Sequence, residues 1–474
     1  MTRTGTVFVS SLLLFLGATL VAQDKGGSVV DKDGGPVTAY LCKRVVTVSG
    51  APIDDAVILV QDGTIKAVGG REGVPIPATA KRVDASTQTA LPGFVHPASL
   101  AFSGKSRHST SGKSTSGDKK VSASLTVTRR GSEAFARAGY TTIAVIPTGG
   151  GVTGLGCLLR PTKDGEELLN LSDLLAEDGV VLSMGFASGT VSKKAWIDLL
   201  AKARKYLADL AAFEKAKGEE PAKKPAKKPE KKPEKKPAAA KPAKSTEKKS
   251  SEKPKQEDPK KKPAEKASEK KPEPKKPTEP KKDPKLMPLV DVISGRQAGV
   301  LAMGTTKDLL HFADVFASEK SFRPTLLLSA SGVRSRVEAW RLVDQIKELG
   351  VPLIMGAGIG AAPRSITRRV EQRILLDAGV PIALVPGSAL PNGEQFRFRL
   401  SELVRHGLRA DEVLRAVTLT PAEILGIQAR CGSLEAGKDA DILLFSGDPL
   451  EPTSDLVEVI VGGETVYRRG EGNK

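Results

Sequence analysis

The chain has 474 residues, enough for two or three domains, and a formal net charge of +18. Residues 221–285 alone hold 25 lysines against 11 acidic residues, a net charge of +14. The remainder has 48 basic and 44 acidic residues, a net charge of only +4, so the composition excludes a globular part that is basic throughout. We therefore expect no specific nucleic acid as a partner.

The first predicted element is an apolar run at residues 7–22, VFVSSLLLFLGATLVA, preceded by the positive charge of Arg3. The run is short for a membrane span, and polar residues follow it directly. It predicts a signal peptide over residues 1–22, with an uncleaved N-terminal anchor as the alternative. No other stretch is continuously apolar enough to cross a bilayer, so we expect a protein that is not transmembrane after signal removal. We expect it to be secreted or periplasmic, at the cell envelope.

Next come short β-branched segments such as RVVTVSG, DAVILVQDG and TIKAVGG, each closed by glycine or aspartate turn signals. From residue 93 to about residue 216, apolar strand-like runs alternate with amphipathic helical patterns, for example SEAFARAG before TTIAVIP. Such alternation predicts βα units and a parallel sheet. The same alternation resumes at residue 286, as in RVEAWRLVDQIKELG before VPLIMGAG.

Between these two blocks lies the lysine-rich segment, which contains 14 of the 32 prolines and no aromatic residue. A chain of this composition cannot bury enough apolar surface to offset the entropy of ordering. We expect a disordered Lys/Pro-rich insertion over residues 217–285, with polyproline II character. Its charge suggests an anionic envelope polymer as a possible partner, although a solvated insertion that binds nothing in particular is the simpler alternative.

The last forty residues return to β-rich texture, with DADILLFSG, LVEVIVGG and ETVYRRG. β-rich ends around a βα middle predict a barrel carrying a small β-sandwich built from both chain ends. The sandwich would comprise residues 38–92 and 429–470, and the barrel residues 93–216 and 286–428. The three cysteines are odd in number and widely spaced, which argues against a disulfide framework or a zinc cluster. We expect Cys42, Cys157 and Cys431 to be buried apolar residues.

Two of these segments resemble the amidohydrolase superfamily, and most closely its imidazolonepropionase-like branch. They are APIDDAVILVQDGTIKAVGG with RVDASTQTALPGFV near the N-terminus, and the run that contains TPAEILG, GSLEAGKDADILLF and GDPL near the C-terminus. The glycine-rich RAGYTTIAVIPTGGGVTGLGCLLRP resembles an active-site loop of that branch. The resemblance implies a distorted (β/α)8 TIM-like barrel with a composite β-sandwich.

It also implies one or two divalent metals at the C-terminal mouth of the barrel, where they activate water and polarise a scissile carbonyl. The family carries two metal-binding histidines two residues apart, shortly after the LPG at residues 91–93. Those positions are occupied here by Ala98 and Leu100, which cannot bind metal. His96 falls where the family usually has an aspartate, and we expect it on the same strand face as Ala98 and Leu100.

The remaining family positions offer no replacement ligand. The lysine or glutamate position falls near Ser183 to Ser188, and the catalytic aspartate position falls near Gly387. The two later histidine positions fall at residues 302–304 and 329–331, which read AMG and SAS. We therefore expect no metal cofactor, and we assign no catalytic residue. A divalent metal such as zinc is the alternative if the site is rearranged, for example around His96 and His108.

Candidate binding residues at the mouth are His96 and the glycines Gly149, Gly150 and Gly151. The glycines, with Gly154, satisfy the GxGxxG spacing, but the strand-like run that follows them is not the helix that a dinucleotide site requires.

Three functional hypotheses follow. The first is a catalytically impaired homologue that binds a small molecule or a protein partner at the barrel mouth. The second is an active hydrolase of non-peptide C–N bonds with a rearranged site. The third is an envelope-binding module that acts through the basic insertion. The sequence leaves the ligand and the oligomeric state open.

Overall fold

The computed structural model describes residues 34–102, 115–163, 167–187, 189–218, 279–316, 321–328, 337–361 and 366–470. The expected signal peptide and residues 219–278 of the expected insertion lie outside these ranges. The chain divides into two units, Met1–Ala203 with Lys282–Lys474, and Arg204–Lys281. The contacts described below all lie within the first unit. Among the described helices, none has the length and apolar character needed to span a membrane.

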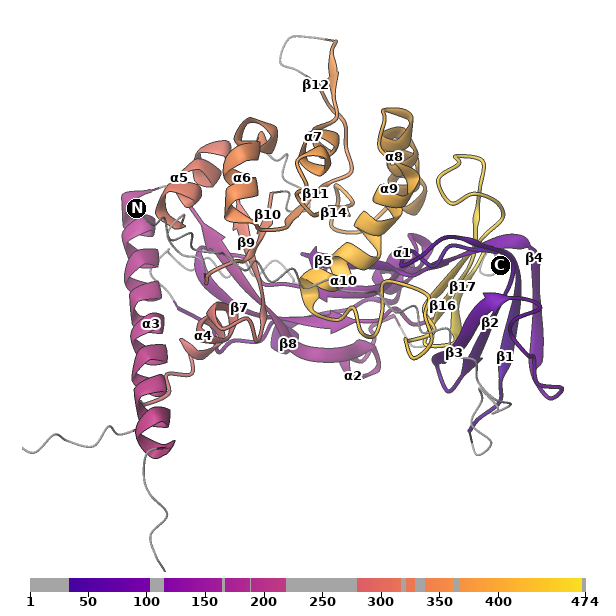
Figure 1. Cartoon of the computed structure of the whole chain (residues 1–474), viewed down its shortest axis with the longest axis horizontal. Coiled ribbons are helices and arrows are strands. Elements are labelled where there is room, and N and C mark those ends of the chain that lie inside the picture. The colour runs from indigo at the N-terminus through magenta and orange to yellow at the C-terminus, as the bar shows by residue number, and fades with distance from the viewer. Residues whose placement is uncertain are drawn as a thin grey trace, which may run out of the picture. The chain divides into compact units, whose positions relative to one another are not determined.

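One sheet of seven strands is built from both ends of the chain (Figure 1). Its order is β17-β16-β15-β4-β1-β2-β3, and β4 pairs antiparallel with β15, so that Ala90 lies opposite Leu444. Asp62 and Gly63 both have positive φ, the geometry of a tight turn that joins two antiparallel strands. The strands are β1 (Thr38–Val45), β2 (Ile53–Gln61), β3 (Thr64–Gly70), β4 (Lys81–Pro92), β15 (Ile442–Phe445), β16 (Leu456–Val461) and β17 (Glu464–Arg468).

This sheet curls around its own core. Ile65 of β3 and Ile460 of β16 come from distant strands of the sheet, yet they belong to the same buried cluster. The backbone of Ile65 also donates a hydrogen bond to the carbonyl of Lys438, just before β15. The predicted assembly from both termini is therefore confirmed, although the strands form one curled sheet instead of two separate layers.

The second sheet is the barrel. Its eight strands follow the order β14-β11-β10-β9-β8-β7-β6-β5. Seven run parallel to one another, and β7 is antiparallel to both of its neighbours, which is the distortion of the (β/α)8 plan. The strands are β5 (Phe94–Ser99), β6 (Tyr140–Val145), β7 (Gly151–Leu159), β8 (Leu175–Phe186), β9 (Ala298–Met303), β10 (Thr325–Leu327), β11 (Leu353–Gly356) and β14 (Ile382–Val385).

The barrel interior is apolar, and every strand of the sheet contributes to it. Val95, Val181, Leu327 and Val385 are among its members, which fits the branched residues that usually fill such barrels. The edge strands β5 and β14 contact each other, and helices α9 (Ala410–Val417) and α10 (Leu419–Leu425) contact both of them. These helices complete a barrel that is nearly closed by its strands.

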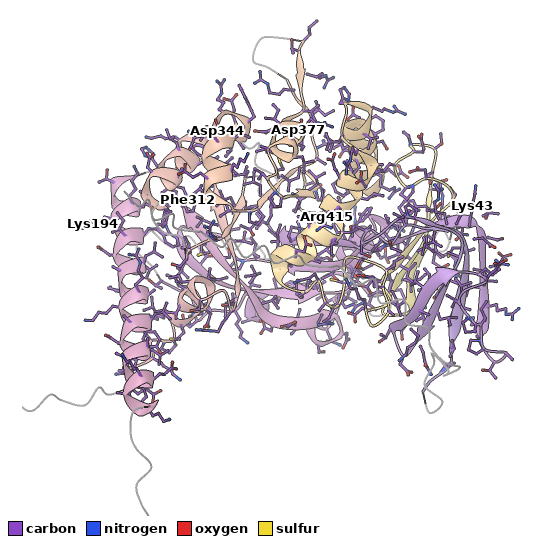
Figure 2. All side chains as sticks on the ribbon, in the orientation of Figure 1. Lys43, Lys194, Phe312, Asp344, Asp377 and Arg415 are labelled. Atoms are coloured by element: carbon purple, nitrogen blue, oxygen red, sulfur yellow. The ribbon has the colours of Figure 1, made fainter. Side chains whose placement is uncertain are left out.

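The other helices are short, apart from α3. Phe312 of α5 is buried and stacks on Phe316 at 4.5 Å between ring centroids, whereas Lys194 of α3 is exposed (Figure 2). The remaining elements are η1 (Val121–Ser124), α1 (Arg129–Arg137), α2 (Leu171–Leu174), α3 (Thr190–Gly218), α4 (Met287–Ile293), α5 (Thr306–Phe316), η2 (Ala339–Leu342), α6 (Val343–Leu349), β12 (Gly360–Ala361), β13 (Arg368–Arg369), α7 (Glu371–Asp377) and α8 (Gly393–Arg405).

A buried ion pair joins the barrel to the curled sheet. Arg160, directly after β7, binds the carboxylate of Asp441, directly before β15, and also reaches Asp439 at 2.8 Å. The Asp441 side chain is only 4% exposed. Burial raises the pKa of Asp441, and the positive charge of Arg160 opposes that shift. The three cysteines are buried and free, as predicted.

Candidate binding site at the barrel mouth

The mouth is formed by the segments that follow the carboxyl ends of the parallel strands, where barrels of this class place their active sites. Ala98 lies in the buried interior cluster, and Leu100 packs against it. Both side chains are apolar and already contribute to the packed core. They offer no ligand at the two positions where the resemblance places the histidine pair.

His96 does not share a face with Ala98, contrary to our expectation. The pairing of β5 with β6 shifts between His96 and Ser99, because two residues, Pro97 and Ala98, lie opposite one. Proline has no N–H to donate to a strand ladder, and such bulges reverse the alternation of side chains. Val95 and Ala98 therefore both belong to the interior cluster, whereas His96 packs on the outer side.

The His96 ring lies in an aromatic cluster, 5.3 Å from the Tyr140 ring and 6.1 Å from the Phe135 ring of α1. Its Nδ1 accepts a hydrogen bond from the Ala98 amide at 3.3 Å, and only 2% of the residue is exposed. Burial lowers the pKa of His96 to about 3. These contacts identify His96 as a neutral, buried packing residue in an aromatic cluster, whereas it was a candidate for binding a ligand at the mouth.

The three candidate glycines do lie at the mouth, in the connection from β6 to β7. The space above Gly185, at the end of β8, is filled by this loop, because a Cβ there would come within 2.0 Å of the Gly149 carbonyl oxygen. Gly151 begins β7 with a φ of 75°, a conformation that favours glycine. The predicted strand after the glycines is confirmed as β7, so no dinucleotide-type helix follows them.

The loop is fixed to β8 by hydroxyl groups. Ser183 is 2% exposed and donates to the Pro147 carbonyl at 2.7 Å, and Thr153 donates to the Ser183 carbonyl at 2.8 Å. Ser183 stands in the window of the family's lysine or glutamate position. Its hydroxyl is already committed to holding the glycine-rich loop.

Arg399 of α8 reaches the end of β14, and the sequence did not predict this residue at the site. Gly387 stands near the family's aspartate position, and a Cβ built there would lie 3.2 Å from Nη1 of Arg399 on α8. The same nitrogen would be 3.8 Å from a Cβ on Gly358, beyond the end of β11. The guanidinium of Arg399 thus occupies the space in which an aspartate side chain would project. The only signal in the sequence is an arginine-containing helix, GEQFRFRL, shortly after this strand.

Gln372 of α7 supports the same corner of the mouth. Its Nε2 donates to the carbonyls of Gly356 and Gly358 at 2.9 and 3.0 Å, which holds the loop that leaves β11. The residue is 1% exposed, and its Oε1 is buried without a hydrogen-bond partner in the described structure.

The residues described at the mouth do not fit a divalent metal. Within the described ranges, no group of three or more histidine, cysteine, aspartate or glutamate side chains could hold an ion. Of the other histidines, His311 lies with its Nδ1 2.5 Å from Lys193 Nζ, and His406 ends α8 with its Nδ1 2.8 Å from the Glu402 carbonyl. His108 and residues 329–331 lie outside the described residues.

A hollow of about 810 Å³ lies at the opposite end of the barrel, where β8 and β9 begin. Apolar side chains such as Val180 and Ile427 line it together with charged ones. The charged groups have partners: Arg296 binds Asp291 at 2.6 Å, for example. This hollow offers volume but no unpaired charge.

Several known proteins resemble this chain in sequence or in structure. The model of the amidohydrolase family matches residues 302–467. An imidazolonepropionase of Shouchella clausii is 35% identical over 133 residues, which cover 27% of this chain and 29% of that protein. One from Streptococcus pyogenes serotype M6 is 29% identical over 206 residues, or 35% of this chain and 49% of that protein. The chain thus spans less than half of the length of these two relatives.

Among solved structures, an amidohydrolase from Thermotoga maritima has a similar fold. It aligns with a TM-score of 0.60 at 19% sequence identity, over 91% of this chain and 100% of that one. At this identity the likeness concerns the fold, and it agrees with the barrel and the curled sheet described above.

Proposed function

Because the chain belongs to the amidohydrolase superfamily, in its imidazolonepropionase-like branch, we propose that it acts at the mouth of its barrel, as a ligand-binding homologue without catalytic metal. The observation that carries the proposal is the replacement of the ligand set by groups with other tasks. Ala98 packs in the interior, Ser183 holds the glycine-rich loop, and the space beside Gly387 is filled by Arg399.

Metal-dependent hydrolysis needs nitrogen or carboxylate ligands that converge on an ion and position a water. Each described position that would supply one has an apolar, hydroxyl or glycine residue instead. Fold membership does not by itself supply the chemistry, because function depends on the site. The Gly149–Gly151 loop and the segments after β11 and β14 are the surfaces that we propose contact the ligand.

Metal content tests this proposal. We expect purified full-length protein to contain well under one equivalent of zinc, iron, manganese or cobalt by mass spectrometry, and its melting temperature to be unchanged by a chelator. One equivalent of a tightly held metal, with a melting temperature that falls on chelation and recovers on readdition, would overturn it.

An active C–N hydrolase with a rearranged site is the competing function. It predicts turnover of a dihydropyrimidine, an imidazolone or an acylated dipeptide, with and without added zinc. We expect no turnover above the rate of a heat-denatured control.

We also propose that the protein works at the cell envelope, where its basic segment adheres to anionic polymer. The support is the net charge of +14 carried by residues 221–285. Deleting this segment should abolish sedimentation with isolated envelopes at low salt and leave the melting temperature nearly unchanged. Equal sedimentation of the deleted and full-length chains would contradict the proposal.

A further inference from the structure

We propose that the barrel mouth binds a small oxyanion, a carboxylate or a phosphate group, through the guanidinium of Arg399. This inference rests on the proposed function and names the chemistry of its ligand. The charge at this place is reversed. The resemblance implies an aspartate near position 387 beside a metal cation, whereas this protein has the positively charged guanidinium of Arg399 there.

The position of Arg399 is the first step. Its Nη1 lies 3.2 Å from the place of a Cβ on Gly387 and 3.8 Å from the place of one on Gly358. Both glycines are two residues beyond the carboxyl end of a parallel barrel strand. The absence of side chains at these two positions is what admits the guanidinium to the mouth. A carboxylate at position 387 would neutralise it.

The second step is that the charge is available. Within the described part of the chain, no hydrogen bond or ion pair engages Arg399, although it is partly buried. Two arginines of other helices, by contrast, are engaged in ion pairs: Arg373 of α7 binds Asp377 at 2.9 Å and Arg415 of α9 binds Glu423 at 2.6 Å. A planar guanidinium with free N–H groups matches the geometry of carboxylate and phosphate oxygens.

The third step is independent of the charge. The Gln372 carboxamide at the same loop is buried, and its Oε1 has no described partner. Buried acceptors are nearly always satisfied, so an unsatisfied one indicates a missing donor. An unused acceptor thus belongs to the side chain that holds the Gly356–Gly358 loop, next to which the guanidinium lies.

The test uses full-length protein and three probes: glycolate, its neutral analogue glycolamide, and inorganic phosphate. Binding is measured by calorimetry, and phenylglyoxal modification of Arg399 is followed by peptide mass spectrometry. The variants are Arg399→Met, which removes the charge, and Gly387→Asp, which places a carboxylate beside it. Arg405→Met is the matched control, because Arg405 lies on the same helix, is exposed and has no described partner.

We expect glycolate or phosphate to bind the wild-type protein and to protect Arg399 from modification, and glycolamide to do neither. Arg399→Met and Gly387→Asp should each weaken anion binding at least about tenfold, as expected for loss of a charged hydrogen bond, and Arg405→Met should leave it unchanged. The relative affinity for glycolate and phosphate assigns the carboxylate or phosphate class.

The inference would be overturned if neither anion bound the wild-type protein, or if anions bound equally to the wild-type protein and to Arg399→Met. Circular dichroism and the melting temperature of each variant report whether it is folded, and Gly387→Asp provides a test that keeps Arg399 in place. Metal analysis of the same wild-type preparation distinguishes a failure of this inference from a failure of the proposed function. Low metal without anion binding contradicts only this inference, whereas one tight equivalent of metal contradicts the proposed function.

Discussion

Replacing His96 with leucine should make the stability of the protein less sensitive to acid. His96 is 2% exposed, and burial lowers its pKa to about 3, from an ordinary value of 6.5. The folded chain therefore binds fewer protons at this site than the unfolded chain does. The contribution of the neutral His96 ring to the free energy of unfolding is fully present above pH 6.5, the pKa of histidine in the unfolded chain. It is lost as the pH falls from 6.5 toward 3.

The size of the effect follows from the two pKa values. Between about pH 7.5 and about pH 5, the unfolded histidine takes up most of a proton and the folded one takes up almost none. The linkage relation then gives a loss of roughly 2 kcal/mol of unfolding free energy from this side chain alone. The carboxyl groups of the chain add their own pH dependence, so the prediction concerns the difference between wild type and variant.

Urea denaturation at the two pH values, followed by circular dichroism, measures that difference. We expect the wild-type protein to lose about 2 kcal/mol more than His96→Leu does. Phe135→Leu is the matched control, because it disturbs the same aromatic cluster without removing a titrating group, and it should show the wild-type pH dependence. Equal acid sensitivity of His96→Leu and the wild-type protein would show that the ring is not buried in its neutral form.

Arg160→Met should destabilise the protein by about 3–5 kcal/mol in urea denaturation at neutral pH, because it leaves the buried Asp441 carboxylate without Arg160. The penalty should shrink as the pH falls, since the pKa of Asp441 is raised and protonation removes its charge, and the double variant with Asp441→Asn should recover part of the loss. Gly185→Ala should lower the melting temperature, because the new Cβ would lie 2.0 Å from the Gly149 carbonyl. Gly189→Ala is the control and should leave the melting temperature unchanged, because a Cβ at that position meets nothing within 4 Å. Equal melting temperatures for the two variants would contradict the packing of the Gly149–Gly151 loop on Gly185.

The sequence predicts the architecture well because the architecture depends on periodicity and on local turn signals. Alternating strands and helices indicate the barrel, and the similar texture of both chain ends indicates their joint sheet. The orientation of His96 could not be predicted in this way. A prediction from the pattern assumes a regular strand, and the bulge at Pro97 and Ala98 places Ala98 on the face opposite to that of His96.

The site is predicted less completely, for a related reason. The resemblance to the family indicates which positions lack ligands, such as Ala98 and Gly387, because these are properties of single positions. It does not show what fills the vacated space. That Arg399 reaches the end of β14 depends on the packing of α8 and on two glycines that are far apart in the sequence. Such a neighbour can be recognised only once the tertiary structure is known.

The pairing of β4 with β15 has a consequence for the order in which this protein can fold. One edge of β4 pairs with β1, and its other edge needs a strand that is synthesised after nearly the entire barrel. Until then, a nascent chain carries an open strand edge, which is a template for wrong pairing. Closing so distant a contact is also intrinsically slow. The curled sheet can therefore be completed only after the C-terminal strands have been synthesised.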